Sequence, residues 1–188
     1  MQIIIEKPRV LCVLVGPSGA GKTTVANKLF ERFGMTTAES HTDRAPRYEG
    51  ETGHVFVSSE TMASLSAGNK LVAPTTFDGH CYGYTTDDLA SADIVITDLP
   101  GAEDIRETAK SIGKPVYVIG LTVSPDEASE RMRVRGDSEE AVSRRLTHDA
   151  QKFHGMKYIC DVCLHNRNLN NTVLLVWQLL QTRRNIRF

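Results

Sequence analysis

The chain has 188 residues, of which 40% are hydrophobic and 24% charged, and its formal net charge is −1. These proportions fit a globular enzyme with a single core and exclude the disordered and fibrous classes. A net charge this small creates no broad field for nucleic acid or a membrane surface, so we expect neither as a partner. Any anion binding must therefore come from local clusters of basic residues.

The N-terminal residues and the cysteines bear on the cellular compartment. Glu6 and Pro8 stand where a signal peptide would carry its apolar stretch. The late apolar run at 173–180 is shorter than the roughly 20 residues that span a bilayer. Four cysteines are few for a disulfide framework, and Cys160 and Cys163 lack the second ligand pair of a structural zinc site. We therefore expect a cytoplasmic protein in which these two cysteines are reduced strand residues.

Apolar runs predict the strands of the core. Residues 9–15 form a continuous run, which is typical of a strand that is buried on both faces of a parallel sheet. A helix is predicted to begin at Lys22, where apolar residues start to recur at helical spacing. Two further strands are predicted at 92–98 and 115–121, with a helix-like stretch at 103–112 between them. This alternation favours a mostly parallel sheet with helices on its faces.

Two stretches depart from this alternation. The segment from about 39 to 89 is rich in Thr, Gly, Pro and His with short strand-like pieces, which indicates an inserted smaller lobe. After the third core strand, two charged helices are predicted, the first capped by Ser124 and the second by Asp137 or Ser138. A last strand at 158–164 and a terminal helix would complete the core.

The run Gly-Pro-Ser-Gly-Ala-Gly-Lys-Thr at 16–23 matches the phosphate-loop pattern in full and lies between the first strand and the first helix. Its glycines let backbone N–H groups turn onto phosphate oxygens, and the helix N-terminus adds a partial positive charge. Lys22 would reach the β- and γ-phosphates of ATP, and the Thr23 hydroxyl would ligate Mg²⁺. The predicted donor-binding residues here are Gly16, Ser18, Gly19, Ala20, Gly21, Lys22, Thr23 and Thr24.

A phosphate loop leaves the acceptor open, because GTPases, ATPases and small-molecule kinases all use it. The stretches at 40–47 and 50–58 resemble the acceptor-binding region of guanylate kinases, with a serine, two arginines around a proline, and a glycine turn before a Phe-Val-Ser strand. The Gly-His-Cys-Tyr-Gly run at 79–83 and the charged stretch at 130–146 are similar to further motifs of that family, the second to its lid. The resemblance extends, in order, over roughly residues 10 to 180.

This resemblance implies an α/β fold, the P-loop NTPase sandwich, with a core parallel five-stranded sheet, an inserted acceptor-binding lobe and a helical lid. It implies one guanylate kinase-like domain over 1–188. The parts would be a core at 1–34, 91–123 and 151–188, the lobe at 35–90 and the lid at 124–150.

The resemblance also implies which residues contact the acceptor nucleotide. Arg44, Arg47 and Tyr82 would bind its phosphate, because two guanidinium groups and a phenol offer paired hydrogen bonds to a dianion. Ser40 and Asp98 would contact the rest of the nucleotide. The alternative for the two arginines is a solvated loop with surface ion pairs.

Arg131 and Arg135 stand four residues apart on a predicted helix and therefore share a face. By resemblance, they and Arg145 would close over the transferred phosphoryl group and offset its charge, acting as catalytic residues together with Lys22. The alternative is a solvated charged helix, and that description suits Arg133.

Other positions match the family less closely. Asn166 matches the family's late asparagine near the donor base, whereas Ile96 replaces the first of two aspartates, and His54 and Tyr84 are further departures.

Ala73 replaces a glutamate that reads guanine. One interpretation is that guanine selection is weakened, unless Thr75 or Asp78 supplies the missing hydrogen-bond acceptor. The other is that Ala73 is a packing residue with no bearing on the base.

The function expected from these residues is Mg²⁺-dependent transfer of the γ-phosphoryl group of ATP to a nucleoside monophosphate, with GMP or dGMP as the acceptor. One alternative is a small-molecule or sugar-phosphate kinase on the same scaffold. Another is a non-catalytic guanylate-kinase-like binding module, although such modules are expected to have lost the phosphate loop. The expected partners are the acceptor and ATP, and the protein is expected to be a monomer or a homodimer.

Overall fold

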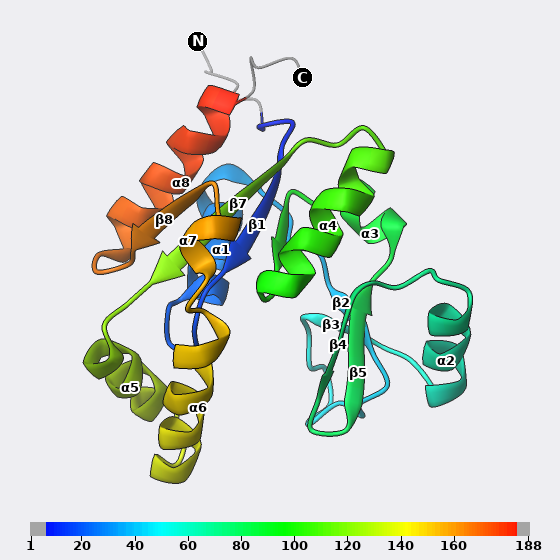
Figure 1. Ribbon diagram of the computed structural model, residues 1–188, viewed down its shortest axis with the longest axis horizontal. Helices are drawn as coiled ribbons and strands as arrows, with labels where there is room; N and C mark the ends of the chain where they lie inside the picture. The colour runs from blue at the N-terminus through cyan, green and yellow to red at the C-terminus, as the bar shows by residue number, and fades with distance from the viewer. Residues whose placement is uncertain (1–6, 184–188) are drawn as a thin grey trace.

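The computed structural model describes residues 7–183 (Figure 1). Its core is a four-stranded parallel sheet in the order β6-β1-β7-β8. A second four-stranded sheet, in the order β3-β2-β5-β4, forms the lobe at the lower right of Figure 1. The core strands are β1 (Leu11–Val15), β6 (Ile94–Ile96), β7 (Val116–Thr122) and β8 (Val162–His165).

Strand β1 explains the layering of the core. Every residue of β1 is buried, which confirms the prediction from its continuous apolar run. Cys12 and Leu14 face α1 (Lys22–Phe33) and α8 (Leu169–Arg183), while alternate residues of β1 face α4 (Leu99–Ser111) and α7 (Met156–Ile159). The sheet therefore lies between two helical layers, as the strand–helix alternation predicts.

The number of core strands differs from the expected five. In the fifth position the structure has an isolated parallel bridge between Thr37 and Ile94. The Ile94 carbonyl oxygen accepts from the Ala38 amide at 2.8 Å, and the Ile94 amide donates to the Thr36 carbonyl oxygen at 2.9 Å. The segment follows β6 only over these residues, because the chain then continues into the lobe through β2 (Ser40–Thr42).

Two boundaries also differ from the predictions. Helix α4 begins at Leu99 rather than near residue 103, because the Asp98 side chain accepts a hydrogen bond from the Gly101 amide and caps the helix. The last strand begins at Val162 rather than at residue 158, since Met156–Ile159 forms the short helix α7. Cys163 is therefore a strand residue as predicted, whereas Cys160 is the C-cap of α7, and both thiols are free.

The remaining elements belong to the lobe and the lid. Ser138, rather than Asp137, caps the second lid helix, and that helix ends at Lys152. The two lid helices pack on each other through Ala128, Met132 and Val142. None of the helices within 7–183 combines the length and the apolar character needed to cross a membrane. The lobe contains β2, β3 (His54–Phe56), α2 (Ser59–Ala67), β4 (Val72–Phe77) and β5 (His80–Tyr84). Helix α3 (Thr86–Ser91) then leads back to the core. The lid contains α5 (Pro125–Val134) and α6 (Glu139–Lys152).

The contact between α1 and α8 gives a test of this architecture. The Phe33 and Trp177 rings stack with centroids 4.1 Å apart, whereas Phe30, also on α1, is 58% exposed. Phe33→Ala should lower the free energy of unfolding by about 2 kcal/mol, because it removes a partly buried aromatic pair. Phe30→Ala is the matched control and should change that free energy by less than about 0.5 kcal/mol. Equal effects in urea unfolding would show that the pair does not hold α8 to the core.

Candidate active site

The phosphate loop joins the end of β1 to the start of α1, and its glycines are required by close contacts. A methyl group on Gly16 would lie 2.2 Å from the Leu121 carbonyl oxygen, and one on Gly19 would lie 2.7 Å from the Ala128 carbonyl oxygen. Both glycines also have positive φ angles, which favour residues without a side chain. The loop is thus fitted between β7 and α5. Thr23 and Thr24, the second and third residues of α1, are exposed, and the other predicted donor residues are buried or partly buried. The full set is Gly16, Ser18, Gly19, Ala20, Gly21, Lys22, Thr23 and Thr24.

Lys22 turns its ammonium group back into the loop. Its Nζ donates to the Gly16 carbonyl oxygen at 2.6 Å and to the Pro17 carbonyl oxygen at 3.0 Å. Burial lowers the pKa of Lys22 to about 8, although the nearby Asp149 carboxylate acts in the opposite direction. A buried cation with carbonyl partners is suited to a charged phosphate group, which would raise this pKa again.

A carboxylate of the lid already occupies the loop. The Ser18 amide donates to Oδ2 of Asp149 at 2.6 Å, and His148 lies 3.5 Å from the other oxygen of that carboxylate. A carboxylate oxygen carries the charge that a phosphate oxygen would carry, so this contact shows that the loop accepts an anion. The residues present therefore fit a polyphosphate group.

Asn166 and Arg131 pack against the other side of the loop. The Asn166 side-chain amide donates to the Ala20 carbonyl oxygen at 2.8 Å, and Arg131 donates to the backbone oxygens of Gly19 at 3.2 Å and Asn166 at 2.7 Å. Oδ1 of Asn166 is buried and has no hydrogen-bond partner among residues 7–183. A buried acceptor without a partner is costly, and a ligand donor would satisfy it. The structure therefore places both predicted residues at the loop.

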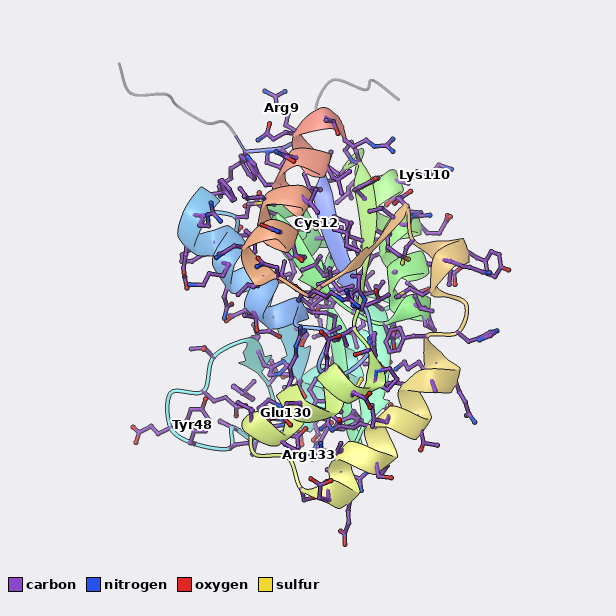
Figure 2. All side chains as sticks on the ribbon, turned by 90° about the vertical axis from the view of Figure 1, so that its left-hand side faces the viewer. Arg9, Cys12, Tyr48, Lys110, Glu130 and Arg133 are labelled. Atoms are coloured by element: carbon purple, nitrogen blue, oxygen red, sulfur yellow. The ribbon has the colours of Figure 1, made fainter. Side chains whose placement is uncertain are left out.

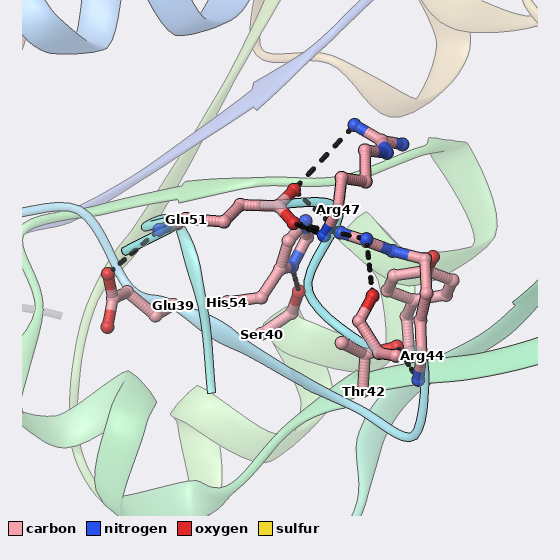
Figure 3. Close-up of polar contacts among 10 residues, drawn as sticks. Glu39, Ser40, Thr42, Arg44, Arg47, Glu51 and His54 are labelled. Carbon is pink, nitrogen blue, oxygen red and sulfur yellow. Dashed lines mark hydrogen bonds and ion pairs between the residues drawn. The ribbon is translucent and has the colours of Figure 1, made fainter. Parts of the chain in front are cut away.

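The predicted phosphate-binding residues of the lobe also meet, around a carboxylate (Figure 3). Arg44 donates to the two oxygens of Glu51 at 2.8 and 3.2 Å, and its Nε donates to the Tyr82 hydroxyl at 3.2 Å. The Arg47 amide donates to Glu51 at 2.6 Å, and the Arg47 guanidinium lies 3.7 Å from the same carboxylate. The side-chain hydrogen bonds from Arg44, followed by the hydrogen bond from the Arg47 backbone amide, lower the pKa of Glu51 to about 2. This cluster binds an oxyanion in the paired geometry that suits a phosphate.

One cavity of about 700 Å³ lies between the first turns of α1, which begins at the phosphate loop, and the lobe. At its wall, the Ser40 hydroxyl lies 2.8 Å from Nδ1 of His54. The Tyr84 hydroxyl donates to the Ile96 carbonyl oxygen at 2.7 Å, so this large side chain is fixed in the wall. Five of the predicted site residues line the cavity: Thr23, Ser40, Arg47, Tyr82 and Asp98.

Ala73 lies outside this cavity lining. It is 4% exposed, has φ of 53°, and its methyl group lies beside Gly101 of α4. The structure therefore supports the packing interpretation of Ala73. Thr75, on the same strand, lines the cavity, whereas Asp78 belongs to the turn between β4 and β5.

The lid arginines have different partners. Arg135 and Arg145 both face Asp137, with Arg135 Nε at 3.3 Å and Arg145 Nε at 3.8 Å from its carboxylate oxygens. Arg133 pairs with Glu139 at 2.6 Å on the exposed side, in agreement with its prediction as a solvated residue (Figure 2). Arg135 and Arg145 thus share one carboxylate, while Arg131 of α5 binds the phosphate loop.

Four charged residues of the site were not predicted from the sequence. Glu51, Asp137 and Asp149 are the three carboxylates that hold the basic clusters, and Lys152 binds Asp98 at 2.8 Å. In the sequence each is an ordinary charged residue. Glu51 and Asp137 lie close to the arginines that they bind, whereas Asp149 and Lys152 are distant in the chain from Ser18 and Asp98. The last turn of α6 carries two of the four.

The carboxylate in the loop leads to a prediction about anion affinity. Asp149→Asn should raise the affinity for a triphosphate by about tenfold at pH 7, because the phosphate no longer displaces a charged acceptor from Ser18. Titration calorimetry with inorganic tripolyphosphate measures this. Glu140→Gln, which removes an exposed charge nine residues earlier on α6, is the control and should leave the affinity unchanged. An Asp149→Asn protein with unchanged or weaker affinity would contradict the competition.

Comparisons with known proteins agree with this site. A family model described as guanylate kinase matches residues 8–183. The chain is 35% identical over 150 residues to a guanylate kinase of Thermosynechococcus vestitus, which covers 74% of this chain and 77% of that relative. It is 32% identical over 147 residues to a guanylate kinase of Sus scrofa, with coverage of 71% and 72%. The crystal structure of guanylate kinase from Anaplasma phagocytophilum shares the fold, with a TM-score of 0.69 and 23% identity over 97% of this chain and 90% of that one. The chain therefore belongs to the guanylate kinase family of phosphotransferases.

Proposed function

We propose that this protein transfers the γ-phosphoryl group of ATP to the phosphate of GMP, or of dGMP, in the presence of Mg²⁺. The carrying observation is that one cavity is lined both by Thr23, at the end of the phosphate loop, and by Arg47, Glu51 and Tyr82 of the anion-binding cluster in the lobe. A kinase that joins two phosphates needs this arrangement, because the acceptor phosphate and the γ-phosphate must meet in line.

On the donor side, Ser18 and the neighbouring amides would bind phosphate oxygens in place of Asp149, and Lys22 would turn its ammonium from two carbonyl oxygens to the phosphates. Asn166 would offer its buried Oδ1 to the donor nucleotide. Thr23 lines the cavity and would hold Mg²⁺ through its hydroxyl, together with phosphate oxygens. When bound, Mg²⁺ neutralises charge on those oxygens.

On the acceptor side, Arg44 would transfer its hydrogen bonds from Glu51 to the acceptor phosphate, with Arg47 as a second guanidinium. The Tyr82 hydroxyl, which accepts from Arg44, would donate its own proton to that phosphate. The attacking group is already an oxyanion at neutral pH, so no side chain has to remove a proton from it. Arg135 and Arg145 would leave Asp137 to offset charge on the transferred group. The chain's contribution is therefore positioning and charge.

The base would be read by polar groups of the cavity. Ser40 and Asp98 line it, as does Thr75, whose hydroxyl offers an acceptor near the position of Ala73. A hydroxyl accepts hydrogen bonds more weakly than the carboxylate that it would replace. We therefore propose that guanine is preferred over other bases without being strictly selected. The family membership and the intact phosphate loop do not favour the sugar-phosphate kinase or the non-catalytic module.

An assay of ADP release with all nucleoside monophosphates and a few sugar phosphates tests this proposal. GMP and dGMP should give the highest kcat/KM, and AMP should fall within about 100-fold of GMP, since one weak acceptor decides the difference. Thr75→Val should lower the preference for GMP over AMP about fivefold, whereas Thr76→Val, at the next residue and outside the cavity lining, should not. If a sugar phosphate is the only acceptor used, the nucleotide proposal is wrong.

Donor binding should also depend on the protonation of Lys22. Its pKa of about 8 means that the free protein loses this ammonium charge as the pH rises through 8. The affinity for ATP should therefore fall about tenfold per pH unit between pH 8.5 and 9.5. Fluorescence titration of a labelled ATP analogue at each pH measures this fall. Lys22→Met should bind weakly and show no such slope, and a flat wild-type profile to pH 9.5 would exclude a titrating Lys22.

A further inference from the structure

The last turn of α6 contacts both the phosphate loop and the wall of the cavity. Asp149 contacts the Ser18 amide of the phosphate loop, and Lys152, three residues later on the same helix face, lies 2.8 Å from Oδ2 of Asp98. In Figure 1 this end of α6 rises from the lid to the lower edge of the core, below α7. The Lys152 and Asp98 side chains are 33% and 19% exposed, and Asp98 lines the cavity.

Asp98 does not depend on Lys152 for its position. Its other oxygen, Oδ1, accepts from the Gly101 amide at 2.9 Å as the cap of α4. The carboxylate is therefore held by the backbone, and the lysine is the exchangeable partner. A lysine has a flexible four-carbon stem, so its ammonium can move by several ångströms without a change in the helix.

The ammonium of Lys152 lies near the other cations of the site. Burial is the main cause of the lowered pKa of Lys22, but the charges of Arg135 and Lys152 lower it further. Lys152 is thus close enough to act on the group that would bind the γ-phosphate, while it touches a residue that lines the acceptor cavity. Its charge thus acts on the donor lysine, and its ammonium is bonded to the wall of the acceptor cavity.

We propose that Lys152 is a catalytic residue, whose ammonium leaves Asp98 and binds the phosphoryl group during its transfer. The inference rests on the proposed function. In the transfer, the bond from the γ-phosphorus to the oxygen that bridges to the β-phosphate breaks, and a bond from an acceptor-phosphate oxygen to that phosphorus forms. Lys152 keeps its protons throughout and donates hydrogen bonds to the equatorial oxygens. A cation at this point stabilises charge that moves between two phosphates.

Kinetics of Lys152→Met and Lys152→Arg test the proposal. Lys152→Met should lower kcat by about 100-fold and change each KM by less than about threefold, while Lys152→Arg should recover at least a tenth of the wild-type kcat. The control is Lys157→Met on α7, which removes an exposed lysine and should leave kcat unchanged. The unfolding midpoint of each variant is measured alongside, and Lys152→Gln replaces Lys152→Met if the latter does not fold. A kcat within twofold of wild type, or an increase in the acceptor KM alone, would overturn the proposal.

A second comparison separates catalysis from mere neutralisation of Asp98. If Lys152 binds the phosphoryl group, Lys152→Met should lower kcat by a similar factor in the wild type and in an Asp98→Asn background. If Lys152 only neutralises Asp98, the substitution should have no effect once that carboxylate is gone, and the proposal is wrong. Failure of the proposed function itself would be seen separately, because the wild type would then show no turnover with any nucleoside monophosphate.

Discussion

The structure depends on the pairing of each phosphate-binding cluster with a carboxylate of the same chain. Glu51 holds the arginines of the lobe, Asp149 lies on the phosphate loop, and Asp137 faces two arginines of the lid. Groups that bind phosphate are concentrated positive charge, and partly buried charge is stable only when it is paired. The Glu51 and Asp137 pairs lie within the lobe and within the lid, whereas the contact of Asp149 with Ser18 joins the lid to the phosphate loop.

Much of the donor site follows from local sequence, since the phosphate loop is one uninterrupted segment. Its strand, turn and helix are set by neighbouring residues, and the close contacts of Gly16 and Gly19 are the physical reason for the glycine pattern. The lobe residues were predicted through a resemblance, and the structure brings Arg44 and Tyr82 within hydrogen-bond distance across 38 residues. Prediction succeeded where a short segment carries its own geometry.

The rest could not be predicted because it depends on contacts that are distant in the chain. Ser18 and Asp149 are 131 residues apart, and nothing near either residue indicates the other. The expected strand at 158–164 fails for a different reason: a short apolar run fits a strand or a helical turn equally well, and Met156–Ile159 packs as a helix against α4. The position of Ala73 could not be predicted by matching motifs, because an irregularity in β4 directs its side chain into the hydrophobic core.

The carboxylates that pair with the cations lower the net free energy gained when a phosphate binds. A phosphate that arrives at Arg44 or Ser18 does not meet a bare cation, because it replaces a carboxylate that already uses the same hydrogen bonds. The net gain is the difference between a phosphate dianion and a single carboxylate charge, which is much smaller than the gross interaction. Asp149 belongs to the lid, so its exchange for a phosphate also removes a contact between the lid and the phosphate loop, whereas Arg44 and Glu51 both belong to the lobe. Phosphate binding at the loop and the position of the lid are therefore linked through the same hydrogen bond, and neither cluster of cations is left unpaired before or after the exchange.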